Sequence, residues 1–128
     1  MSQTAAALDI STEVARIHAA AYERGDEPVN TTINAELTIC VVQLALLPVE
    51  QLLISRRELG SVRDQHEALD HLLAPSLSAA VERATGRMVS TFRTATHPEA
   101  GLSVLIFTFA PAVAGPRPEE GIGGERPR

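Results

Sequence analysis

The sequence predicts a two-layer α+β domain, in which helices pack on one face of a four-stranded, mainly antiparallel sheet. The first observation is the order of the elements that the residue patterns indicate, which is α-β-β-α-α-β-β. The second is that short turns join the strands in two pairs, and short connections favour antiparallel pairing. The third is a hydrophobic content of 45% in 128 residues, which is enough to form a core.

The longest apolar stretch of the chain, Leu37 to Leu53, contains the central strand of this prediction. Its first part, Leu37–Leu44, is rich in closely spaced β-branched residues and is apolar on both faces, as expected of a strand buried on both sides. From Leu47 onward the apolar residues have helical spacing, and Pro48 fits the first turn of a helix.

The other elements follow from periodicity and from residues that end helices. Asn34 is expected to form the first hairpin turn in a left-handed conformation, and Pro75 is expected to kink or break the long helix. The expected elements are a helix from Ala6 to about Arg24 that ends at Gly25, a strand Val29–Ile33, a helix from Pro48 to Leu59 that ends at Gly60, a helical region Val62–Thr85 that ends at Gly86, a strand Arg87–Thr94, a loop His97–Gly101 and a strand Leu102–Phe109.

The domain is expected to span residues 1–110 as a single unit. Residues 111–128 form a tail rich in proline and glycine with no apolar period, and we expect this tail to be disordered.

The composition argues against several classes of function. A net charge of −5 is unlike that of a nucleic-acid-binding domain or of a protein that lies on anionic lipid. The N-terminus lacks the pattern of a signal peptide, and the apolar stretch falls short of the ~20 residues that a membrane helix needs. We therefore expect a soluble cytoplasmic protein without membrane insertion. The single cysteine, Cys40, fits a reducing compartment.

Neither a metal site nor a reactive thiol is expected. His66, Glu67, Asp70 and His71 are close in sequence, but only Glu67 and His71 have the i, i+4 spacing of ligands on one helix face. We interpret this group as a solvated helix face. Cys40 lies within the predicted core strand, which indicates a buried and inert thiol.

Arginine side chains could form an anion site, and this is the alternative function that the sequence leaves open. The candidate ligand-binding residues are Arg63, Arg56 and Arg57, with Arg83, Arg87 and Arg93 as further members of the set. The competing interpretation is that these arginines are scattered over the surface and paired with acidic neighbours. Because no phosphate-binding glycine loop, catalytic triad or paired-carboxylate motif is evident, we expect a non-enzymatic protein with no cofactor.

The strands that are apolar on both faces carry the strongest functional indication. If the helices cover one face of the sheet, the other apolar face predicts a partner surface. A twofold homodimer is the simplest partner, so we predict a protein–protein interaction module that is a homo-oligomer. The alternative is a monomer whose first helix covers the second face.

Several short motifs between Leu8 and Phe109 resemble those of the MpsC-like family, a small domain long described as of unknown function. The motifs are a glycine-proline turn at Arg24–Pro28, a helix start at Leu47–Glu50, an arginine at Arg63, a Val-Glu-x-x-x-Gly-x-x-Val segment with Val81, Glu82, Gly86 and Val89, and a closing apolar strand at Val104–Phe107.

The resemblance implies an accessory component of a Na+-translocating membrane-potential-generating system. In such a system the partners would be membrane transporter subunits, which carry the ions, and this chain would not be the channel itself.

Overall fold

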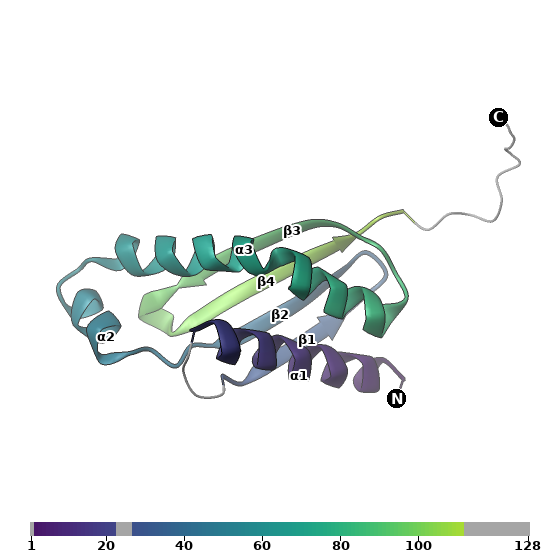
Figure 1. The fold of residues 1–128 in the computed structure, drawn as a ribbon, viewed down its shortest axis with the longest axis horizontal. Helices are drawn as coiled ribbons and strands as arrows, with labels where there is room; N and C mark the ends of the chain where they lie inside the picture. The colour runs from purple at the N-terminus through teal and green to yellow at the C-terminus, as the bar shows by residue number, and fades with distance from the viewer. Residues whose placement is uncertain (1, 23–26, 112–128) are drawn as a thin grey trace, which may run out of the picture.

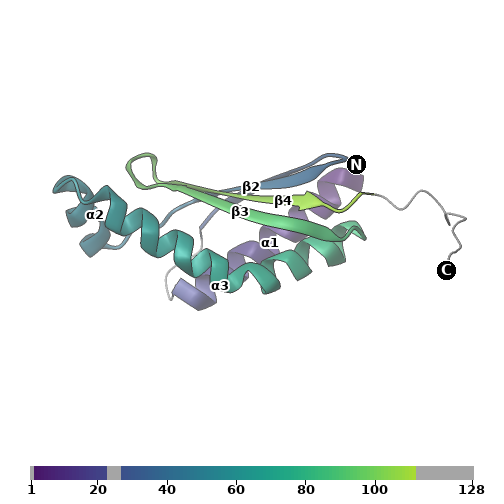
Figure 2. The same ribbon diagram turned by 90° about the horizontal axis from the view of Figure 1, so that it is seen from above.

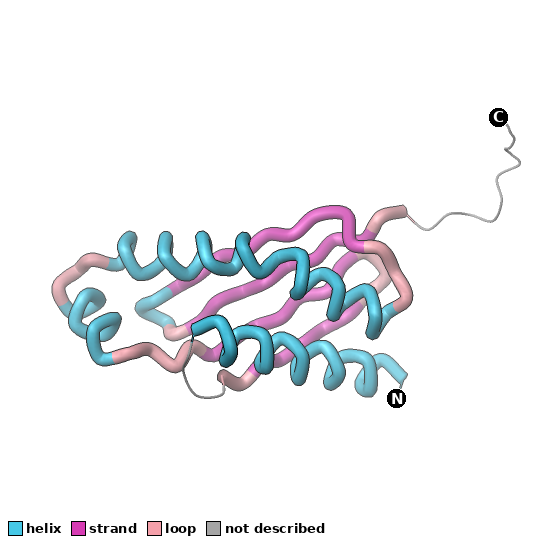
Figure 3. The backbone as a smooth tube through the Cα atoms, viewed as in Figure 1, coloured by secondary structure: helices cyan, strands magenta, loops and turns pink. Residues whose placement is uncertain are grey.

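The computed structural model describes residues 2–22 and 27–111. The described residues form three α-helices and one sheet, in the predicted order, so the α+β class is confirmed. Figures 1 and 3 show how these elements are arranged. The elements are α1 (Ser2–Tyr22), β1 (Val29–Ile33), β2 (Leu37–Gln43), α2 (Pro48–Ser55), α3 (Leu59–Thr85), β3 (Val89–His97), a 3-10 turn (Pro98–Ala100) and β4 (Leu102–Phe109). The predicted helix end at Gly25 and the tail at 112–128 lie outside the described residues.

The strands form one antiparallel sheet in the order β1-β2-β4-β3. The hairpins β1–β2 and β3–β4 pair as the short connections predict, and their inner strands β2 and β4 pair with each other. The turn at Asn34 differs from the expectation, because Arg57 is the only described non-glycine residue with a positive φ. Instead, the Asn34 side chain accepts hydrogen bonds from the backbone N–H groups of Glu36 and Leu37.

Helices α1 and α3 lie on the same side of the sheet, as predicted, and Figure 2 shows the other side without a helix. Every second side chain of β2 and β4 points towards these helices, because side chains alternate along a strand. The core between the two layers is formed by Ile10, Val14, Leu77, Val81, Cys40, Val42, Leu105, Phe107 and Phe109.

The opposite side of the sheet, which we call the open face, is apolar at its centre. Leu37, Ile39 and Val41 of β2 alternate with the buried residues of that strand and are half-buried. In β4, the side chains of Leu102, Val104 and Ile106 lie on the same face and are also half-buried. The described residues therefore leave one apolar face of the sheet with no helix over it.

Two predicted helix boundaries were wrong. Helix α2 ends at Ser55 rather than near Leu59, because the backbone reverses at Arg57, which has a φ of 66°. Gly60 therefore belongs to the first turn of α3 and does not end α2. Helix α3 continues through Pro75 without a break, since Pro75 lies on the exposed side, where water can satisfy the freed backbone carbonyl.

The third strand also differs from its predicted bounds. It begins at Val89 and extends to His97, because it pairs with β4 along most of the length of that strand. The predicted loop is correspondingly short and contains the 3-10 turn.

Two glycines at the ends of α3 offer a matched test of the helix boundaries, since Gly60 lies in its first turn and Gly86 directly follows Thr85. Gly86 ends the helix with a φ of 71° and has open space around it, so Gly86→Ala should destabilise the fold by about 1 kcal/mol through backbone strain alone. Gly60 lies within the helix, where an added Cβ would make an ordinary contact with Arg63, so Gly60→Ala should stabilise by roughly 0.5 kcal/mol. Urea denaturation of the two variants measures both values, and equal effects of the two would contradict these helix ends.

Candidate functional site

A buried histidine links the end of α1 to α3 and to the segment before β1. The side chain of His18 is 2% exposed, and its Nε2 lies 3.1 Å from Asp70 Oδ1. Its Nδ1 lies 3.6 Å from Glu27 Oε1. Neither nitrogen makes a well-aligned hydrogen bond to the described residues, so the two carboxylates act on the imidazole through close but poorly directed contacts. An imidazolium in this position would balance carboxylates that burial alone would make costly.

The position of His18 between these acids changes its titration. Burial by itself lowers the pKa of His18, but the interactions with Asp70 and then Glu27 outweigh burial and raise the pKa to about 9. The imidazole is therefore protonated at neutral pH.

The same cluster contains a second histidine–carboxylate pair. His66 Nε2 lies 2.7 Å from Glu50 Oε2, and both side chains are buried. Tyr22 stacks on the His66 ring and donates a hydrogen bond of 3.0 Å to Asp70. The cluster thus joins α1, α2 and α3 at one end of the domain.

Most oxygens of this cluster accept hydrogen bonds that fix backbone or neighbouring side chains. Glu50 Oε1 accepts from the Leu47 backbone N–H, and Glu27 Oε2 accepts from the Ala45 backbone N–H. The other Asp70 oxygen accepts from the Thr94 hydroxyl of β3. These bonds hold the segment between β2 and α2 in place, so the arrangement serves to position elements.

The structure corrects the interpretation of the predicted metal-like group. His66 and Asp70 are buried rather than solvated, while His71 is exposed. The Glu67 side chain is directed to β3 instead, where it accepts a hydrogen bond from the Thr96 backbone N–H. Within residues 2–22 and 27–111, no group of three or more potential ligands is arranged to hold a metal ion.

Sequence reasoning did not identify His18, Glu27 or Glu50 as members of a site. One signal was present: His18 follows Val14 by one helical turn, so it continues an apolar stripe. His66 and Asp70 likewise continue the stripe that begins at Val62. A polar residue at a core position of a helix is the pattern that predicts such a buried cluster.

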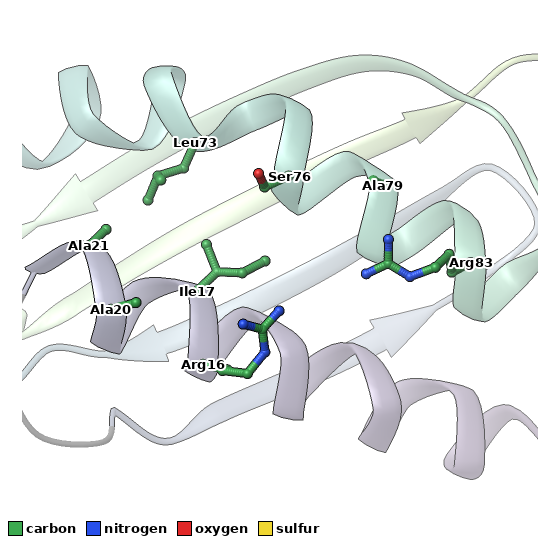
Figure 4. Close-up of a pocket in the computed structure, with 8 residues that line it drawn as sticks. All are labelled: Arg16, Ile17, Ala20, Ala21, Leu73, Ser76, Ala79 and Arg83. Carbon is green, nitrogen blue, oxygen red and sulfur yellow. The ribbon is translucent and has the colours of Figure 1, made fainter.

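A groove of about 500 Å³ lies between α1 and α3 on the outer side of the helix layer (Figure 4). Its lining residues are Arg16, Ile17, Ala20, Ala21, Leu73, Ser76, Ala79 and Arg83. Figure 4 shows the side chains of Arg16 and Arg83 reaching into the gap between the helices. Both guanidinium groups approach the Glu13 carboxylate, at 2.7 Å and 3.7 Å, which leaves the pair with an excess positive charge.

The predicted anion-binding residues lie elsewhere, at the junction of α2 and α3. Arg56, Arg57 and Arg63 are all exposed there, and Arg63 approaches Asp64 at 3.5 Å. Arg83 is in the interhelical groove, and Arg87 lies over the ring of Phe109. Arg93 is an exposed residue of β3, so the six arginines considered together are spread over several surfaces.

The thiol of Cys40 is buried in the core, as predicted. Burial raises its pKa to about 11, which keeps the thiol protonated and unreactive at neutral pH.

A comparison with known protein families found a match. Residues 3–111 match the family model described as "Na+-translocating membrane potential-generating system (MpsC)". The chain belongs to the MpsC family. No curated protein and no solved structure matches this MpsC-family chain. The family description refers to a membrane system, yet no described helix of this chain is long and apolar enough to cross a bilayer.

The buried His18 predicts a decrease of stability at alkaline pH. The pKa of this histidine is about 9 in the folded protein, against 6.5 for an unperturbed imidazole, so the stabilising contribution is complete below pH 6.5. It is lost as the pH rises towards 9, and the shift corresponds to a contribution of about 3 kcal/mol. Urea denaturation between pH 6 and pH 10 should show this loss.

The variant His18→Gln should be less stable at pH 6.5 and should show a flatter pH dependence. His71→Gln is the matched control, because His71 is an exposed histidine of α3. If His18→Gln kept the full alkaline decrease, the assignment of this titration to His18 would be wrong.

Proposed function

We propose that the protein is a non-enzymatic, cytoplasmic interaction module that forms a homodimer and acts as an accessory to a Na+-translocating membrane-potential-generating system. The observation that supports this proposal is the open face of the sheet. Six apolar side chains of β2 and β4 lie half-buried on this face, and Figure 2 shows no helix over it. Apolar patches that are accessible to solvent are typical of interaction sites.

The arrangement of the polar residues supports a role without catalysis. The acidic and histidine side chains of the cluster are buried, and several of them bond to backbone groups. A general acid or base must reach its substrate within hydrogen-bond distance. Enclosure of these groups inside the domain favours a positioning role over an enzymatic one.

The family description supports the accessory role. It names a membrane-potential-generating system, and the described helices of this chain do not span a membrane. We therefore propose that membrane transporter subunits carry the ions and that this chain binds to them.

The homodimer can be tested by light scattering at low micromolar concentration. The expected mass is twice the chain mass of 13.7 kDa, because burial of the apolar face favours association. The mass should be insensitive to salt concentration, since the centre of the face is uncharged. A mass equal to one chain at all concentrations tested would refute the dimer.

A second candidate function is the sensing of a small anion, and the interhelical groove favours it. The two arginines supply bidentate donors for a carboxylate or phosphate, while Ile17 and Leu73 offer apolar contact beside them. The groove volume of about 500 Å³ is within the usual range for small-ligand sites. An aliphatic carboxylate has the matching chemistry.

A thermal-shift series with phosphate, acetate and hexanoate tests this second candidate. Hexanoate at about ten times its Kd should add about 1.4 kcal/mol of stability and raise the Tm by several degrees. The variant Arg83→Gln should remove the shift, and Arg63→Gln should retain it. If Arg63→Gln removed the shift and Arg83→Gln retained it, the anion site would lie at the junction of α2 and α3. If none of the three anions shifted the Tm, the sensing function would be refuted.

A further inference from the structure

We infer that the partner on the open face is a second copy of this chain, packed sheet against sheet, so that the dimer has four layers in the order helix, sheet, sheet, helix. This inference rests on the proposed homodimer and adds the surface and the mode of packing. Its centre is a group of four β-branched residues, Ile39, Val41, Val104 and Ile106, which we call the central quartet.

The register of the sheet brings the central quartet together. Ile39 is directly opposite Ile106, and Val41 is directly opposite Val104, across the β2–β4 pair. Both pairs lie on the open face, in the middle two strands of the four. Side chains directly opposite on antiparallel strands are only about 5 Å apart, so the quartet forms one continuous apolar patch.

The residues around the central quartet become polar towards both edges of the sheet. On β1, Asn30 and Thr32 are exposed beside it, and on β3, Thr91 and Arg93 are exposed, while Ala95, opposite Val104, is half-buried. An apolar centre surrounded by a polar rim is the usual anatomy of a protein–protein interface.

The dimensions of the open face favour a sheet over a single helix as its partner. Four strands about 4.8 Å apart, each with about seven residues, give a face of roughly 19 Å by 24 Å, on the order of 450 Å² before side-chain relief is counted. A single helix, about 10 Å wide, would cover about half of this width. On the other side of the same sheet, two helices are used. A stable dimer buries about 800 Å² per protomer, and the flat area of the face is smaller than this, so the partner must cover most of the face and also contact the protruding side chains around it. A second four-stranded sheet matches the face in both length and width.

The edges of the sheet are poorly suited to the alternative mode, in which strands of two copies pair edge to edge. The edge strand β1 has only five residues, and the edge strand β3 has an irregularity between Val89 and Thr91. Short edge strands, bulges and charged side chains protect sheets against such pairing. Edge pairing would also leave the central quartet in contact with water.

The charge distribution is compatible with self-association. Among the strand residues of the open face, only Arg93 and His97 are titratable, and both lie on β3 at the edge. The centre carries no charge, so a second copy placed over the central quartet buries no ion there, and Arg93 and His97 lie at the rim of the interface.

Substitution within the central quartet tests this inference. Ile106→Lys and Ile39→Thr are measured by light scattering and by sedimentation over a dilution series. Ile106→Lys should convert the dimer to a monomer, and Ile39→Thr should raise the dimer Kd at least tenfold. Leu72→Lys is the control, because Leu72 is an apolar residue of α3 that is 77% exposed on the helix layer. Circular dichroism should show an unchanged fold in all three variants.

The outcomes separate this inference from the proposed homodimer. If the wild type is a monomer, both the proposed homodimer and the sheet-to-sheet packing are refuted. If the wild type is a dimer and the quartet variants remain dimers with wild-type Kd, the homodimer stands but uses another surface, and the sheet-to-sheet inference is overturned. If Leu72→Lys alone dissociates the dimer, the interface is on the helix layer and the inference is overturned as well. Should Ile106→Lys misfold, the conservative Ile39→Thr variant still decides between these outcomes.

Discussion

The pairing of β2 with β4 is the interaction on which the rest of the structure depends. These strands connect two hairpins that are far apart in sequence, and both of their faces are apolar. The helices α1 and α3 cover only one of these two faces. Cys40, Val42, Leu105 and Phe107 point towards α1 and α3 and are fully buried. The same alternation places equally apolar residues on the other face, so the register that forms the core also forms the exposed apolar surface.

The buried polar cluster determines how the short helix α2 is attached. Helix α2 has only eight residues, and α3 is the element against which it mainly packs. The Glu50 side chain forms hydrogen bonds with the Leu47 backbone N–H at the start of this helix and with His66 of α3. Glu27 accepts a hydrogen bond from the Ala45 backbone N–H, in the segment that precedes α2. Buried carboxylates and histidines are costly unless they are paired, and removing one partner is strongly destabilising. The cluster therefore specifies a single position for α2, which apolar packing of so short a helix would not provide.

The sequence was sufficient to predict the fold class because each strand and helix has a clear period. The hairpins, the turn at Asn34 and the helix end at Gly86 follow from local residue chemistry, although the turn uses the Asn34 side chain rather than a left-handed backbone. The end of α2 was missed because the reversal occurs at Arg57, a residue with no preference for a positive φ. The cluster was missed because its members are far apart in the chain, and no local pattern relates His18 to Asp70. The candidate anion-binding residues were chosen from residue type alone, and residue type does not determine which arginines lie close together across two helices, as Arg16 and Arg83 do.

A sheet-to-sheet dimer would also determine which surfaces stay accessible to other partners. The two helix layers would face outwards on opposite sides, so the interhelical groove and α2 would be present twice and accessible in both copies. Helix α2 exposes Val49 and Leu52 on its outer side, at 58% and 51%. These residues are positioned by the buried pair of Glu50 and His66 immediately behind them. Self-association through the apolar face of the sheet would thus leave the helix layer, with α2 attached through Glu50 and His66, as the surface for the membrane subunits that we propose as partners.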